Sequence, residues 1–286
     1  IMYNEFSHYY YAAVYLHNNT SGTMSVDVIG NKFYGRLNPT NGNPWSVYGI
    51  YADAAPANKY VMNINKNLVI DDTRYGIRIR NNDNANIVGN ILTYHMASNV
   101  TFNNNTQWIR GIFLSNSSLN KVEMNHILWS NYPAGFSITY PDKLQGISME
   151  NVTNSNIICN KMDGMGAGVY IQNNNIGTSY ITNITKNCYN GYKLNNASID
   201  PVGDPSTLTS YNNPFSNITS FRVAGSISTL AKDWYYIGSN DMPTPVQGGI
   251  VSPQVATSAL PACINFTGDP DSSQMRTETE MLQQVI

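Results

Sequence analysis

Charged side chains that could take part in acid–base or metal chemistry gather in one short stretch of the chain. Asp71 and Asp72 stand side by side, and Arg74, Arg78 and Arg80 follow closely. Adjacent carboxylates can supply hard oxygen ligands for calcium or a general acid. The alternative is a solvated turn followed by outward-facing strand positions, and we favour it because isolated charge clusters are more often structural than catalytic.

A second candidate site consists of aromatic and charged side chains at equivalent positions of a repeated phrase. The phrase is a small residue, an apolar residue, any residue and a second apolar residue, as in Gly76-Ile77-Arg78-Ile79. Its third position, and the position two residues further on, give the predicted ligand-binding residues Tyr15, Tyr51, Asp53, Arg78, Arg80, Phe113 and Tyr170.

These residues would meet if successive copies of the phrase are stacked strands, because neighbouring strands lie about 4.8 Å apart. Tyr51 and Phe113 would then flank Arg78, and Asp53 would meet Arg80. Flat aromatic faces with a guanidinium between them suit a sugar chain, through stacking and bidentate hydrogen bonds. An aromatic ladder that only stabilises the sheet is the alternative.

The repeated phrase also predicts the elements that carry these residues. Its copies lie at 13–16, 49–52, 76–79, 111–114, 135–138, 168–171 and 191–194. Alternation with a period of two turns the apolar pair of each copy inward and the residue between them outward. Strand-containing repeats at a spacing of roughly 23 to 36 residues are typical of a stacked-coil solenoid.

A second pattern marks the turns, where a short apolar strand ends in Asn at 28–31, 87–90, 122–125 and 157–160. Asn suits the left-handed backbone of a sharp turn, and its amide can hydrogen-bond the Asn of the next coil. We therefore expect an amide ladder within an all-β, right-handed parallel β-helix. Longer excursions are expected at 96–110 and 140–149.

Composition narrows the classes of partner. Charged residues make up only 12% of the chain, the formal net charge is −2, and Tyr is abundant at 20 residues. A neutral surface of Asn, Ser, Thr and Tyr favours sugars, and it argues against nucleic acid, which needs a concentrated basic patch. No apolar run approaches the roughly 20 residues that span a bilayer. We expect neither a cofactor nor a zinc site.

The three cysteines do not predict a disulfide. Cys159 and Cys188 occupy different offsets within their repeats, so stacking would not place them opposite one another. We expect both to fill small core positions. Cys263 is expected to be free, or paired with a residue outside this sequence.

The chain divides into three predicted parts. Residues 1–240 would form the β-helix, with a degenerate last coil or cap. Residues 241–270 are rich in Pro, Gly and Ser and predict a linker. Residues 271–286 predict the start of a helix, capped by Asp271 or Ser272, that belongs to a following segment. We therefore expect a fragment of a longer polypeptide.

Repeats such as Ser-Asn-Ile-Ile-Cys-Asn at 155–160 and Thr-Asn-Ile-Thr at 182–185 resemble the parallel β-helix repeats of pectate-lyase-like proteins. That superfamily includes polysaccharide lyases and hydrolases, phage tailspikes and bacterial surface proteins. Asn-Cys-Tyr-Asn-Gly at 187–191, with the Pro-rich exit and the following helix, is similar to long secreted proteins of Bacteroidota. The resemblance implies a secreted or cell-surface location, export by the type IX route, and contact with secretion machinery or other surface proteins.

The resemblance does not bring a catalytic motif with it. The Asn-Thr-Asp and Gly-His-Gly triplets that hydrolases of the superfamily carry do not occur in this sequence. We therefore expect a non-catalytic, adhesin-like or glycan-contacting stalk whose partner is a polysaccharide or a cell-surface glycan. One alternative is a polysaccharide-degrading enzyme, with carboxylates about 5 to 9 Å apart near Asp71 and Asp72. Another is a homotrimeric phage tailspike.

Overall fold

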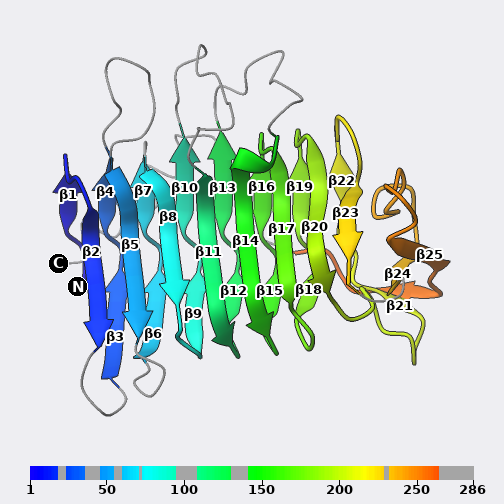
Figure 1. Ribbon diagram of the computed structural model, residues 1–286, viewed down its shortest axis with the longest axis horizontal. Coiled ribbons are helices and arrows are strands. Elements are labelled where there is room, and N and C mark those ends of the chain that lie inside the picture. The colour runs from blue at the N-terminus through cyan, green and yellow to red at the C-terminus, as the bar shows by residue number, and fades with distance from the viewer. Residues whose placement is uncertain are drawn as a thin grey trace.

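A computed structural model describes residues 1–18, 24–35, 46–54, 60–70, 73–94, 108–129, 141–228 and 232–263. They form a right-handed parallel β-helix, in which successive coils stack along one axis (Figure 1). A regular coil gives one strand to each of three sheets, so each strand pairs with its counterparts in the neighbouring coils. The fold class predicted from the sequence is confirmed.

The three sheets are numbered here in the order in which the chain enters them. Sheet 1 consists of β1 (Glu5–Ser7), β4 (Lys32–Tyr34), β7 (Leu68–Ile70), β10 (Ile91–Tyr94), β13 (His126–Trp129), β16 (Lys161–Asp163), β19 (Ile184–Lys186) and β22 (Phe215–Ser216). Sheet 2 consists of β2 (Ala12–Asn18), β5 (Ser46–Ala54), β8 (Thr73–Arg80), β11 (Ile109–Ser118), β14 (Leu144–Thr153), β17 (Ala167–Asn174), β20 (Asn190–Ser198) and β23 (Val223–Ile227). Sheet 3 consists of β3 (Met24–Ile29), β6 (Tyr60–Asn65), β9 (Ala85–Val88), β12 (Lys121–Glu123), β15 (Asn156–Ile158) and β18 (Ser179–Ile181).

The repeated phrase lies in sheet 2, and its opening glycine marks a close approach between coils. A Cβ atom on Gly49 would lie 2.6 Å from the carbonyl oxygen of Gly76, and one on Gly111 would lie 2.7 Å from that of Gly146. A larger residue would push the coils apart at these positions. The apolar pair of the phrase packs in the core, as alternation predicts, with side chains such as that of Ile77 fully buried.

One copy of the phrase was placed wrongly from the sequence. Gly146-Ile147-Ser148-Met149 occupies the fifth coil of sheet 2, because Ile147 pairs with Ile112 on one side and with Val169 on the other. The copy at 135–138 lies outside the described residues. Both copies have the same alternation, so the pattern alone could not choose between them.

Both predicted excursions include residues that the structure places in strands. Residues 144–149 belong to β14 and follow a short 3₁₀ helix, η1 (Pro141–Lys143). Ile109 and Arg110 belong to β11, so the other excursion ends earlier than predicted. Residues 95–107 lie outside the described part of the chain.

A ladder of buried asparagine side chains runs through the turn between sheets 3 and 1. Its members are Asn31, Asn67, Asn90, Asn125, Asn160, Asn183 and Asn213. Nδ2 of Asn90 donates to Oδ1 of Asn125 at 2.9 Å, and the same oxygen accepts the backbone N–H of Asn90. The predicted amide ladder is confirmed.

The left-handed residue of this turn differs from the prediction. It is the residue before each ladder asparagine, for example Met124 with φ 52° or Cys159 with φ 54°. Near the ends of the sheet 2 strands Asn does adopt this conformation, since Asn81 directly after β8, and Asn116 and Asn151 close to the ends of β11 and β14, have positive φ. Asn tolerates this conformation in either turn, so composition could not tell which residue of the buried turn adopts it.

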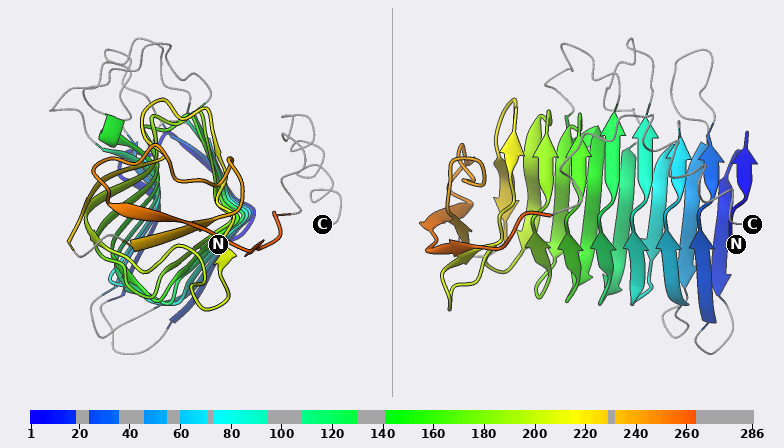
Figure 2. Two further views of the ribbon diagram at one scale, coloured as in Figure 1. Left: turned by 90° about the vertical axis from the view of Figure 1, so that its right-hand side faces the viewer. Right: turned by 180° about the vertical axis from the view of Figure 1, so that it is seen from behind.

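The C-terminal part of the described chain packs on the coils. It contains β21 (Thr209–Ser210), β24 (Lys232–Tyr236), β25 (Val251–Val255) and β26 (Ser258–Ala259). Strands β24 and β25 pair with each other and lie across the end of the coil (Figure 2). Beneath them the ring of Trp234 meets that of Tyr192 edge-on, with centroids 5.0 Å apart. Paired strands therefore occupy part of the predicted 241–270 linker, whereas the predicted helix at 271–286 lies outside the described residues.

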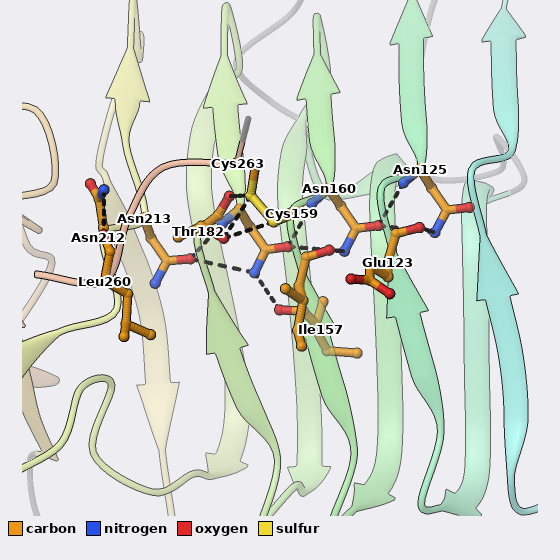
Figure 3. Close-up of a disulfide and its surroundings, with 12 residues drawn as sticks. Glu123, Asn125, Ile157, Cys159, Asn160, Thr182, Asn212, Asn213, Leu260 and Cys263 are labelled. Atoms are coloured by element: carbon orange, nitrogen blue, oxygen red, sulfur yellow. Dashed lines mark hydrogen bonds between the residues drawn. A yellow bond between two sulfur atoms is a disulfide. The ribbon is translucent and has the colours of Figure 1, made fainter. Parts of the chain in front are cut away.

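The chain then turns back along the outside of the coil as far as Cys159 (Figure 3). Strand β26 pairs with β21, and the side-chain amide of Asn212 donates to the carbonyl oxygen of Leu260 at 3.1 Å. Cys263 then forms a disulfide with Cys159. The predictions for both cysteines were wrong, because offsets within the repeat do not reveal a tail that crosses several coils. Cys188 is fully buried, as predicted.

Candidate binding surface

Five of the predicted ligand-binding residues form part of one column on sheet 2 that faces away from the core, although three of them, Tyr51, Phe113 and Tyr170, are only 4 to 5% exposed. From coil to coil the column reads Tyr15, Tyr51, Arg78, Phe113, Ser148, Tyr170 and Lys193. Tyr51 and Phe113 therefore flank Arg78, as the sequence predicted. Tyr170 is separated from Phe113 by the coil that carries Ser148.

A second outward column lies beside the first, and the sequence analysis missed it. It contains Tyr48, Tyr75, Arg110 and Gln145, each directly before the glycine that opens the phrase. This residue and the third position of the phrase face the same side, since the rings of Tyr48 and Tyr51 stack with centroids 4.5 Å apart. An aromatic or arginine residue before the glycine was the signal that could have revealed this column.

The guanidinium of Arg78 lies among four aromatic rings. Its Cζ atom is 5.1 to 5.4 Å from the ring centroids of Tyr48, Tyr51, Tyr75 and Phe113. Nη1 of Arg78 also donates a hydrogen bond to the hydroxyl of Tyr48 at 2.6 Å. Each well-placed cation–π contact is worth about 0.5 to 2 kcal/mol, so the rings hold Arg78 in place.

Arg110 extends this arrangement into the next coil. Its Cζ atom is 4.1 Å from the ring centroid of Phe113 and 5.0 Å from that of Trp108. Only 9% of the Arg110 surface is exposed. Burial lowers the pKa of Arg110, and the nearby Tyr75 and Tyr170 oppose this effect. The guanidinium stays protonated at neutral pH because its ordinary pKa is above about 12.

Asp53 lies beside the first column and contacts Tyr51 and Arg80. Its Oδ2 atom accepts a hydrogen bond from the Tyr51 hydroxyl at 3.0 Å and lies 3.8 Å from Nη1 of Arg80. The meeting of Asp53 with Arg80 was predicted. Burial, together with the hydrogen bond to Asp53, raises the pKa of Tyr51 to about 12. Arg80 is exposed, so its ion pair contributes under about 1 kcal/mol.

The aromatic surface opens to solvent at the first coil. Tyr11 and Tyr15 are 51% and 49% exposed, and their rings meet edge-on with centroids 6.0 Å apart. The ring of Tyr15 stacks on Tyr51 at 5.2 Å, which continues the surface to Arg78. We call the whole set the aromatic–arginine platform: Tyr11, Tyr15, Tyr48, Tyr51, Tyr75, Arg78, Trp108, Arg110 and Phe113.

The carboxylates of the other candidate site fall outside the described part of the chain. Asp71 and Asp72 lie outside the described residues, so their link to Arg78 stays a prediction.

Within the described ranges, no group of three or more His, Cys, Asp and Glu side chains is arranged to hold a metal ion. In the same part of the chain, no helix has the length and apolar character needed to cross a membrane. Neither protein-family models nor curated protein sequences match this chain.

Proposed function

We propose that this β-helix is a non-catalytic, extracellular stalk that contacts glycans through the aromatic–arginine platform. The observation that carries this proposal is the continuous line of rings from solvent-exposed Tyr11 and Tyr15 to the ring-bound guanidinium of Arg78. Aromatic rings present a large, rigid apolar face at the surface, and a neighbouring guanidinium offers a fork of hydrogen-bond donors. Sugars match both features, since they combine apolar C–H faces with hydroxyl groups.

The Cys159–Cys263 disulfide supports the extracellular part of the proposal. Disulfides form and persist in oxidising compartments and are rare in the cytosol. The similarity of the segment at 187–191, together with the Pro-rich exit, to long secreted proteins of Bacteroidota points the same way, and we extend the proposal to export by the type IX route. A neutral, Asn- and Tyr-rich surface also suits an adhesin-like role among polysaccharides.

The test is a polysaccharide binding array with a variant in which the exposed rings are removed. Tyr11→Ala/Tyr15→Ala should reduce glycan affinity at least roughly tenfold, because stacking of an aromatic residue on a ligand is worth about 1 kcal/mol or more per contact. The control is Val61→Ala, which removes an exposed apolar side chain from sheet 3. The rings of Tyr11 and Tyr15 are half exposed, so the melting temperature of the double variant should stay close to that of the wild type.

Two outcomes would contradict the proposal. Unchanged glycan binding by Tyr11→Ala/Tyr15→Ala would remove the platform as the contact surface. Release of reducing or unsaturated sugar ends by the wild type would show that the protein is an enzyme. In that case Asp71→Asn and Asp72→Asn would be the first variants to assay for lost turnover.

A further inference from the structure

Two guanidinium groups of the platform have no carboxylate partner within the described ranges. Among the described residues, ion pairs neutralise Arg80, Lys121 and Lys193, but none involves Arg78 or Arg110. Glu150 attracts Arg110 electrostatically, yet the two side chains form no ion pair. Both guanidinium groups lie over aromatic rings, Arg78 over that of Tyr51 and Arg110 over that of Phe113.

The hydrogen-bonding capacity of both arginines is also largely unused. The Nε atoms of Arg78 and Arg110 are buried and have no hydrogen-bond partner in the part of the chain that the structure describes. Among the described residues, Arg78 donates only to the Tyr48 hydroxyl, and Arg110 forms no side-chain hydrogen bond. Buried polar groups in proteins nearly always have a partner. A buried cation without an acceptor is costly, and ring contacts offset only part of that cost.

The two guanidinium groups lie close enough to act on one ligand group. Both contact the ring of Phe113, with Cζ 5.4 Å from its centroid for Arg78 and 4.1 Å for Arg110. Both also lie over Tyr75, at 5.2 and 5.9 Å. Their like charges repel, and a negative group between or beside them would relieve both the repulsion and the unused donors.

We propose that Arg78 and Arg110 together bind an anionic group, a carboxylate or a sulfate, of the glycan that the platform contacts. This inference rests on the proposed function and narrows its ligand from polysaccharides in general to acidic ones. The rest of the chain is close to neutral, with a formal net charge of −2. Preference for an acidic glycan would therefore come from these two side chains and not from the net charge of the protein.

The first test compares polymers that share a sugar backbone and differ in their charged groups. Polygalacturonate is paired with its methyl-esterified form, and dextran sulfate with dextran. Wild-type protein should bind the charged member of one pair roughly tenfold more tightly, since charge-assisted bidentate hydrogen bonds are among the strongest polar contacts. The pair that shows the difference identifies carboxylate or sulfate as the group recognised. Added salt should narrow the difference.

The variants separate the anion site from the aromatic surface. Arg78→Gln/Arg110→Gln should lose the preference, so that its affinities for the charged and the neutral member of the pair agree within about twofold, and it should still bind both because Tyr11 and Tyr15 remain. The control, Lys121→Gln, also removes a cation but lies on sheet 3. Equal affinity of the wild type for both members of both pairs would overturn the inference, as would an equal loss of preference in the control.

A second measurement needs no polymer. Galacturonate monomer or inorganic sulfate should raise the melting temperature of the wild type more than that of Arg78→Gln/Arg110→Gln, because a ligand that binds only the folded state stabilises it, whereas the general stabilising effect of sulfate is common to both proteins. If these anions stabilise the wild type more than the variant while no polymer binds, the glycan function fails and the anion site remains. If they stabilise both proteins equally and the polymers show no charge preference, the anion site itself is refuted.

Discussion

Cys159 and Cys263 join the C-terminal segment to a turn in the middle of the coil stack, with their Cα atoms 5.7 Å apart and 104 positions apart in the sequence. The intervening chain holds the last coils and strands β24 and β25, which lie across the end of the β-helix. One covalent bond therefore holds the segment that returns from this end against the outside of the coils.

We expect Cys263→Ser to lower the free energy of unfolding by about 2 to 4 kcal/mol, because the cross-link restricts the unfolded chain. Denaturant unfolding with and without reductant would measure the loss. Reductant should destabilise the wild type and a Cys188→Ala control, whose disulfide is intact, but should leave Cys263→Ser unchanged. An equal effect of reductant on all three proteins would argue against this disulfide.

Cys188 should behave as an inert thiol in the folded protein. Burial raises its pKa to about 12, and only the thiolate reacts readily with alkylating reagents. Iodoacetamide at pH 8 should leave the native, oxidised protein unlabelled and should modify one thiol after denaturation. Because the folded pKa is raised, the related stability is present below about pH 9 and lost as pH rises towards 12. Rapid labelling of the native protein would contradict the buried position.

The buried amide ladder should be sensitive to a single break. Asn125→Leu removes the oxygen that accepts both the backbone N–H and Nδ2 of Asn90. Each buried donor left without a partner costs about 1 to 3 kcal/mol, so we expect a loss of about 2 to 5 kcal/mol in unfolding free energy. Asn156→Ala, at an exposed position of β15, should change it by less than about 0.5 kcal/mol. Similar losses in both variants would mean that the ladder has no special role.

Much of the fold could be predicted from local pattern, because each coil repeats the same physical requirements. The glycine at the start of the sheet 2 phrase and the asparagine of the buried turn recur wherever backbones or amides must meet the next coil, as at Gly111 and Asn125. Pattern failed where two copies competed, at 135–138 and 146–149. It also failed for Cys263, because a tail that runs back along the coil has no counterpart in the repeat.

The sequence predicted one of the two columns of the platform and missed the other, for a geometric reason. Alternation with a period of two correctly brought Arg78 between Tyr51 and Phe113. However, the glycine of each phrase breaks that alternation, so Tyr48 and Arg110 also face outward. A strict period of two predicts that Tyr48 and Arg110 face inward, and the sequence therefore did not identify Arg110 as a candidate binding residue.

Tyr51 should titrate far above an ordinary tyrosine. Burial and the hydrogen bond to Asp53 raise its pKa to about 12, so the stability linked to its protonated form is present below about pH 10 and lost between pH 10 and 12. Thermal unfolding midpoints should fall less steeply with pH over this range in Tyr51→Phe than in the wild type. In Asp53→Asn, ultraviolet absorbance should show a lower pKa for Tyr51. An unchanged titration in Asp53→Asn would contradict the role of that hydrogen bond.

If Arg110 binds a ligand, its buried charge should lower the stability of the protein without that ligand. Arg110→Met keeps the apolar stem against Phe113 and removes a buried cation that has no carboxylate partner among the described residues. We expect the free energy of unfolding to rise by about 1 kcal/mol, because replacing buried charges with well-packed apolar side chains is often stabilising. In Arg80→Met, where the cation is exposed and paired with Asp53, the free energy of unfolding should stay within about 0.5 kcal/mol of the wild-type value.

A clear loss of stability in Arg110→Met would mean that the ring contacts of Arg110 outweigh its desolvation, and the presence of the arginine would then be explained by stability alone. A gain, together with loss of preference for acidic glycans, would mean that the protein keeps a destabilising cation because its ligand uses it.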